Sequence, residues 1–178
     1  MTEAQILLQN RLKWYKVGKS GTTLDEMLLG RQDSKIDEKG RIAFPKKFRQ
    51  ALGDRLIVTQ GFERSLIVVS EKSWKSLLEG TEGLPFTNKN ARETQRFLLG
   101  SAAQVELDEK GRFVLPLHLR GYGQLGEEVV CLGISRYVEI WDKKLWEQHN
   151  IELIKNIEPI TKKLSPASPE LQRGESDE

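Results

Sequence analysis

Residues 37–41 read Asp37-Glu38-Lys39-Gly40-Arg41, and the same five letters return at 108–112. Apolar residues flank both stretches, which is typical of a hairpin loop between two strands. An Asp side chain can accept hydrogen bonds from the backbone N–H groups of such a loop, and a Gly three residues later supplies the positive φ that closes it. We therefore expect two loops of one design, shaped by four residues: Asp37, Gly40, Asp108 and Gly111.

The same loops carry cations that the turn itself does not need. A hairpin requires neither Lys nor Arg at these positions, so their repetition indicates a separate role. We expect these side chains to stand at the tips of the hairpins, pointing at solvent or at an acidic partner: Lys39, Arg41, Lys110 and Arg112.

The duplication continues beyond the loops. Arg41–Pro45 matches Arg112–Pro116 at an offset of 71 residues, and after a one-residue insertion Trp74 matches Trp146. Two copies are too few for a solenoid. We therefore interpret them as two half-domains that pack on each other around a shared core.

The residues of each copy predict the same order of elements, which is strand, loop, strand, short helix, hairpin and helix. In the first copy, Pro45 precedes a short helix that Gly53 ends, and Ser70 can cap the helix that carries Trp74. The predicted class is α+β. The predicted organisation is an N-terminal extension (1–26), a first repeat (27–80), a connector and helix (81–100), a second repeat (101–147), a C-terminal helix (148–163) and a disordered tail (164–178).

Charge is distributed unevenly along the chain. The net charge is only +2, but residues 27–80 hold eleven basic and seven acidic residues, whereas residues 101–147 hold six and eight. The first copy is therefore the more cationic, with a net +4 against −2. Cys131 is the single cysteine and lies in an apolar run, which predicts a buried thiol in a reducing compartment. With no apolar run of about 18 residues, we expect a cytoplasmic protein.

Residues that usually carry catalysis or bind metals are sparse. The two histidines, His118 and His149, lie in non-equivalent settings without a Cys partner, which argues against zinc. No nucleophile elbow, Walker loop or dinucleotide fingerprint is present. We expect no enzyme activity, no metal, no cofactor and no small-molecule substrate.

The doubled Asp-x-Lys-Gly-Arg loop, followed each time by a Pro and an Arg, resembles the MraZ family of bacterial regulators. The resemblance covers residues 27 to about 155, and Met27-Leu28-Leu29-Gly30 matches the usual start of the family. It implies two tandem swapped-hairpin half-barrels of the AbrB and MazE kind, related by a pseudo-twofold axis. It also implies a ring-shaped homo-oligomer, associated with the nucleoid, that binds tandem short repeats in the promoter of the division and cell-wall gene cluster, its own promoter included.

By the same resemblance, the DNA-binding residues would be Lys39, Arg41, Lys110 and Arg112, with Arg31 as a further candidate. Asp37 and Asp108 would orient the arginines, and Arg49 and Arg120 would be structural or face phosphates. Two other interpretations stay open from the residues alone. One is an antitoxin-like or adaptor protein that binds a protein partner through the same fold, and the other is an acid–base hydrolase that uses the paired carboxylates.

Overall fold

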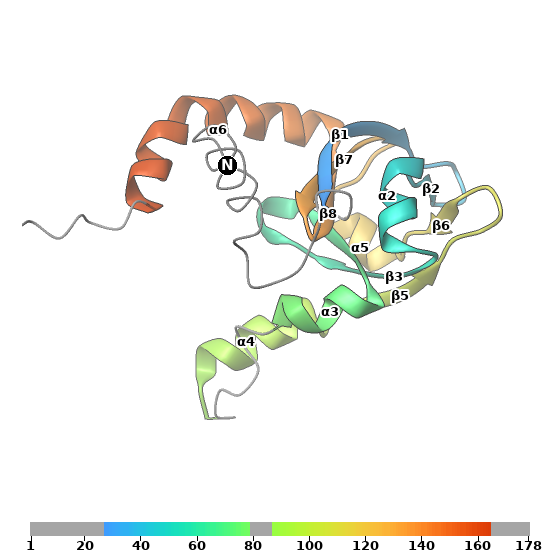
Figure 1. Ribbon diagram of the computed structural model, residues 1–178, viewed down its shortest axis with the longest axis horizontal. Coiled ribbons are helices and arrows are strands. Elements are labelled where there is room, and N and C mark those ends of the chain that lie inside the picture. The colour runs from blue at the N-terminus through green and yellow to red at the C-terminus, as the bar shows by residue number, and fades with distance from the viewer. Residues whose placement is uncertain (1–26, 79–86, 165–178) are drawn as a thin grey trace, which may run out of the picture. The chain divides into compact units, whose positions relative to one another are not determined.

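The computed structural model describes residues 27–78 and 87–164 of the chain (Figure 1). The first copy contains β1 (Leu28–Lys35), β2 (Arg41–Ala43), α2 (Lys46–Leu52), β3 (Arg55–Gln60), β4 (Leu66–Ser70) and α3 (Glu71–Leu78). After α4 (Lys89–Leu98), the second copy contains β5 (Ala103–Glu106), β6 (Arg112–Val114), α5 (Leu117–Tyr122), β7 (Glu128–Ser135), β8 (Tyr137–Asp142) and α6 (Lys143–Leu164). The predicted α+β class and the order of elements are confirmed.

The two copies exchange strands. The larger sheet has the order β1-β7-β8-β4-β3-β5, and its paired strands are antiparallel throughout. The opening strand of the first copy, β1, pairs with β7 of the second copy, while β5 of the second copy pairs with β3 of the first. This reciprocal exchange is the swapped-hairpin arrangement that the family resemblance implies.

A second, two-stranded sheet joins the copies again. It consists of β2 and β6, which pair antiparallel over three residues each. Because each loop runs directly into one of these strands, the pairing brings the two loops to the same part of the molecule (Figure 1).

One hydrophobic core serves both copies. Phe44 and Phe48 of the first copy pack in the same buried cluster as Phe113 and Leu119 of the second, and the rings of Phe44 and Phe113 meet edge to face at 5.6 Å. Cys131 is buried in this cluster, as predicted. Since residues of both halves fill one core, neither half buries its apolar face alone.

Several local predictions hold in detail. The Ser70 hydroxyl accepts a hydrogen bond from the Ser73 N–H at 3.1 Å and so caps α3, and Gly53 follows α2 with φ +79°. Pro45 and Pro116 immediately precede their helices as N-cap residues. The predicted end of α3 at Gly80, most of the connector, the extension 1–26 and nearly all of the tail lie outside the described residues.

The described residues form two compact units, one that ends at Lys143 and one that begins at Lys144. In the second unit the chain is helical to Leu164, and it continues through Pro159. The helix that carries Trp146 and the C-terminal helix predicted at 148–163 are therefore one continuous element.

Candidate nucleic-acid interface

The first loop is organised around the carboxylate of Asp37. Its Oδ1 accepts hydrogen bonds from the backbone N–H groups of Lys39, at 3.0 Å, and Arg41, at 2.9 Å. Its Oδ2 accepts from Nε of Arg41 at 2.7 Å and lies 2.6 Å from Nη2. Gly40, at φ +76°, donates its N–H to the Asp37 carbonyl and closes the turn. One oxygen thus shapes the backbone, while the other orients the guanidinium.

The second loop repeats this arrangement contact by contact. Asp108 Oδ1 accepts from the N–H groups of Lys110 and Arg112, both at 2.9 Å, and Oδ2 accepts from Nε and Nη2 of Arg112 at 2.9 and 2.8 Å. Gly111, at φ +72°, closes the turn. Duplicated sequence has therefore produced duplicated geometry.

The ion pairs shift the pKa values of the groups that form them. The hydrogen bond from Arg41 lowers the pKa of Asp37 below its ordinary 3.8, and Arg112 lowers the pKa of Asp108 in the same way. The pKa of Arg112 is raised, first by its hydrogen bond to Asp108. Both carboxylates are therefore ionised at neutral pH, which suits a role in holding an arginine and not that of a proton donor.

The arginines and lysines of the loops behave differently. We expected all four cations at the hairpin tips, but each arginine folds back onto its own aspartate, and the side chains of Arg41 and Arg112 are only 31% and 27% exposed. The folding back follows from the fork of the guanidinium, which can bind one carboxylate oxygen through two nitrogens. Lys39 and Lys110 are exposed.

The β2–β6 ribbon places the two arginines on one surface. Ile42 and Phe113 are buried, and side chains alternate along a strand, so their neighbours Arg41 and Arg112 lie on the opposite, outward side. Val114, opposite Arg41, is 57% exposed on this side. We call this surface, made by the two loops and the outward side of β2 and β6, the loop face.

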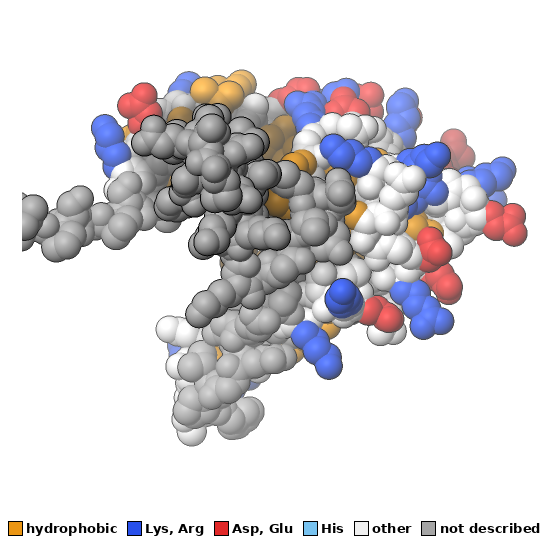
Figure 2. All heavy atoms as spheres, viewed as in Figure 1, with side chains coloured by type: hydrophobic (Ala, Val, Ile, Leu, Met, Phe, Trp, Pro, Cys, Tyr) orange, Lys and Arg blue, Asp and Glu red, His pale blue; other side chains and the backbone are white. Residues whose placement is uncertain are grey.

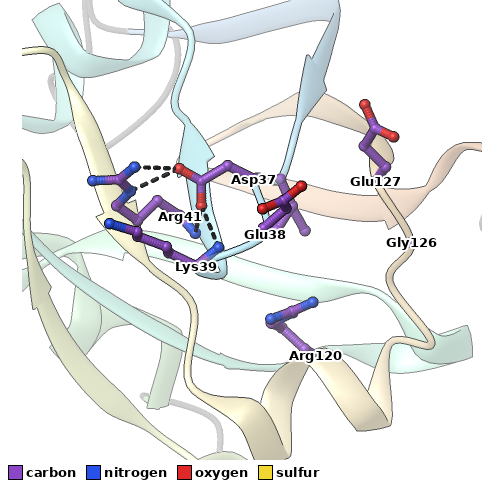
Figure 3. A pocket seen from close by; sticks show the side chains of 8 residues that line it. Asp37, Glu38, Lys39, Arg41, Arg120, Gly126 and Glu127 are labelled. Carbon is purple, nitrogen blue, oxygen red and sulfur yellow. Dashed lines mark hydrogen bonds and ion pairs between the residues drawn. The ribbon is translucent and has the colours of Figure 1, made fainter.

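Charges around the loop face are mixed in sign. Figure 2 shows basic and acidic side chains interspersed over the region that carries β2 and β6 in Figure 1. An open pocket of about 620 Å³ adjoins the first loop, and it is lined by residues of that loop together with Arg120, Gly126 and Glu127 (Figure 3). The loop face is therefore not surrounded by positive charge alone.

Arg31 is not part of the loop geometry. It lies on the edge strand β1, opposite Leu132 of β7, and its Nε is 3.2 Å from the Asp33 carboxylate. Five residues lie between Arg31 and Asp37, the first residue of the loop, and six steps along an extended strand correspond to roughly 20 Å. Arg31 stays a prediction as a DNA contact.

Sequence reasoning left Arg49 and Arg120 without a definite role. The structure places Arg120, on α5, against Gly40 of the first loop, and Arg49, on α2, against Gly111 of the second. The signal available in the sequence was their equivalence at the offset of 71, because both follow the loop and the Pro at the same distance.

Other site chemistries find little support among the described residues. Within 27–78 and 87–164, no three His, Cys, Asp or Glu side chains gather so that they could hold a metal ion. None of the helices in those ranges has both the length and the hydropathy of a membrane-spanning segment.

Comparison with known proteins identifies a family that this chain matches. The family model described as "MraZ protein, putative antitoxin-like" matches residues 27–97 and again 98–164. Two consecutive matches agree with the duplication found in the sequence and in the strand exchange.

Curated relatives span almost the same region. A protein of Caldanaerobacter subterraneus subsp. tengcongensis named "Transcriptional regulator MraZ" is 38% identical over 138 residues, which is 78% of this chain and 96% of the relative. A protein of the same name from Carboxydothermus hydrogenoformans is 42% identical over 123 residues, or 69% of this chain and 86% of the relative.

Proposed function

Since this chain belongs to the MraZ family, we propose that it is a transcriptional regulator that binds specific DNA sequences through the loop face. The observation that carries the proposal is the pairing of two aspartate-braced arginines on one outward surface, joined by the β2–β6 ribbon. No catalytic step belongs to this function.

The geometry of Arg41 suits readout of base edges. Nε and Nη2 face Asp37, whereas Nη1 makes no hydrogen bond or ion pair within the described residues. Bracing by Asp37 fixes the guanidinium plane before DNA arrives, so less side-chain freedom is lost on binding. An arginine held in this way can donate to guanine O6 and N7 in the major groove. The exposed Lys39 and Lys110 are placed to contact phosphates, which position a protein without specifying sequence.

A single chain offers too few contacts for tight binding. Each neutralised phosphate contributes a salt-dependent increment, and two loops reach only a few phosphates. Assembly into a ring-shaped homo-oligomer would present many loops to tandem repeats, and linked contacts can raise avidity by about 10² to 10⁴. The proposal therefore includes a ring, and it places the protein in the cytoplasm, on the nucleoid.

The proposed target follows from the family resemblance. It is the promoter of the division and cell-wall gene cluster, including the protein's own promoter. We assign most contacts to the first loop, because the first copy carries a net +4 and the second −2.

Binding of purified protein to the DNA upstream of its own gene tests the proposal. Arg41→Ala should weaken specific binding by about 1–3 kcal/mol, the usual value of one good base contact. Lys46→Ala is the matched control, because Lys46 is an exposed cation on α2 outside both loops. At one fixed salt concentration, equal affinities of wild type and Arg41→Ala would refute the assignment.

A second candidate function rests on the words of the matched family description, which include "antitoxin-like". Under it, the same fold would bind a protein partner. Recovery of a stoichiometric protein partner, together with no promoter DNA, on purification from cells would favour this function over the first.

A further inference from the structure

Each loop is contacted by the helix of the other copy. A Cβ added to Gly40 would lie 2.7 Å from Nη1 of Arg120 and 3.8 Å from its Cδ, so the end of that side chain lies along the glycine. In the second loop, a Cβ on Gly111 would overlap the guanidinium of Arg49. Figure 3 shows Arg120 extending from its helix beneath the first loop.

Packing, and not hydrogen bonding, holds these arginines in place. The Nε atoms of Arg49 and Arg120 are buried and find no hydrogen-bond partner in the described part of the chain. A buried donor without a partner is unfavourable. Both copies nevertheless have an arginine at this position, which indicates that its contact with the loop has a function.

The backbone ties the same glycines to the opposite copy. The carbonyl of Gly40 accepts a hydrogen bond from the Leu115 N–H at 2.9 Å, and the carbonyl of Gly111 accepts from the Phe44 N–H at 3.1 Å. Each loop is thus held at its glycine by two groups of the other copy, one from the residue that follows its short strand and one from a helix.

We propose that Arg49 and Arg120 are positioning residues that act across the duplication, Arg49 on the second loop and Arg120 on the first. Removal of one arginine should therefore loosen the loop that is distant in sequence and leave the neighbouring loop unchanged. The link to DNA rests on the proposed function, but the crossed effect on the loops does not.

Amide hydrogen exchange of the free protein, followed by NMR, tests the crossed effect. In Arg49→Ala, protection of the Lys110 and Arg112 amides should fall, while protection of the Lys39 and Arg41 amides stays at the wild-type value. Arg120→Ala should give the reverse. Lys46→Ala, on the same helix as Arg49, should change neither loop.

The carboxyl titrations give a second, site-specific measurement. In Arg49→Ala the pKa of Asp108 should rise toward its ordinary value, because a looser loop holds Arg112 less firmly, and the pKa of Asp37 should not move. If Arg49→Ala fails to fold, Arg49→Met keeps the apolar stem of the side chain and should give a smaller shift of the same kind.

A double-mutant comparison isolates the contact itself. Gly111→Ala should loosen the second loop less in an Arg49→Ala background than in wild type, because the overlapping guanidinium is gone. Equal loosening of both loops in Arg49→Ala would overturn the proposal, as would loss of DNA binding with normal protection of both loops. If the proposed function failed, the arginine variants would still show the crossed loss of amide protection, but the wild-type protein would not bind the promoter.

Discussion

Ile42 on β2 lies directly opposite Phe113 on β6, and these two residues occupy the same position in the two copies. On the larger sheet, Ile67 of β4 lies opposite its own counterpart, Glu139 of β8. A pseudo-twofold axis therefore passes through both pairs. The two loops are related by this axis, so each substitution in one loop can be compared with the equivalent substitution in the other.

Replacing Asp37 by Asn should separate specificity from general affinity. The change removes one negative charge beside Arg41, so non-specific DNA binding should strengthen slightly and show a steeper salt dependence. Specific binding should weaken, because the amide holds the guanidinium less firmly than the carboxylate does. Titrations of promoter and unrelated DNA over a range of salt concentrations measure both. An unchanged ratio of specific to non-specific affinity would contradict the bracing role.

Gly40→Ala should destabilise the protein by about 1–3 kcal/mol, since a side chain at positive φ is strained and the new Cβ would meet Arg120. Gly121→Ala is the control. Gly121 lies in α5, and a Cβ there would meet nothing within 4 Å, so this change should stabilise by about 0.5–1 kcal/mol. Urea unfolding measures both changes, and similar effects at the two glycines would refute this interpretation.

Acid should release the arginines from the loops only below the ordinary pKa of an aspartate, 3.8. The pKa of Asp37 is lowered by its hydrogen bond to Arg41. The ion pair therefore stabilises the folded protein fully above pH 3.8, and this stabilisation disappears as the pH falls through the lowered pKa. The same holds for Asp108. Carbon-detected NMR titration of the carboxyl groups should show both midpoints below 3.8, and high salt should move them upward. Midpoints at or above that value would mean that the pairs do not form in solution.

Cys131 should resist alkylation in the native protein. Burial raises the pKa of its thiol to about 12, so almost no thiolate exists at pH 8 and the reagent has no access. Because it is the single cysteine, total labelling by iodoacetamide reports it directly. Labelling should become complete in denaturant, whereas rapid complete labelling without denaturant would show that the core opens readily.

The shape of each loop was predictable from five residues. The turn of each loop is closed by hydrogen bonds within the loop, from Asp37 and Gly40 or their counterparts, and these span no more than four residues along the chain. The cap at Ser70 is local in the same sense, because its hydroxyl oxygen accepts a hydrogen bond from an N–H three residues ahead. The internal repeat was equally predictable, since it can be found by aligning the amino-acid sequence with itself.

The tertiary structure decided which strands pair and which arginine meets which loop. The sequence predicts a strand before the first loop, but it does not say that the partner of β1 is β7, about a hundred residues away. Arg49 reached the loop of the other copy because packing of the shared core brings Phe44 and Phe113 together. Short-range chemistry thus made two similar loops, and long-range packing placed them on one face.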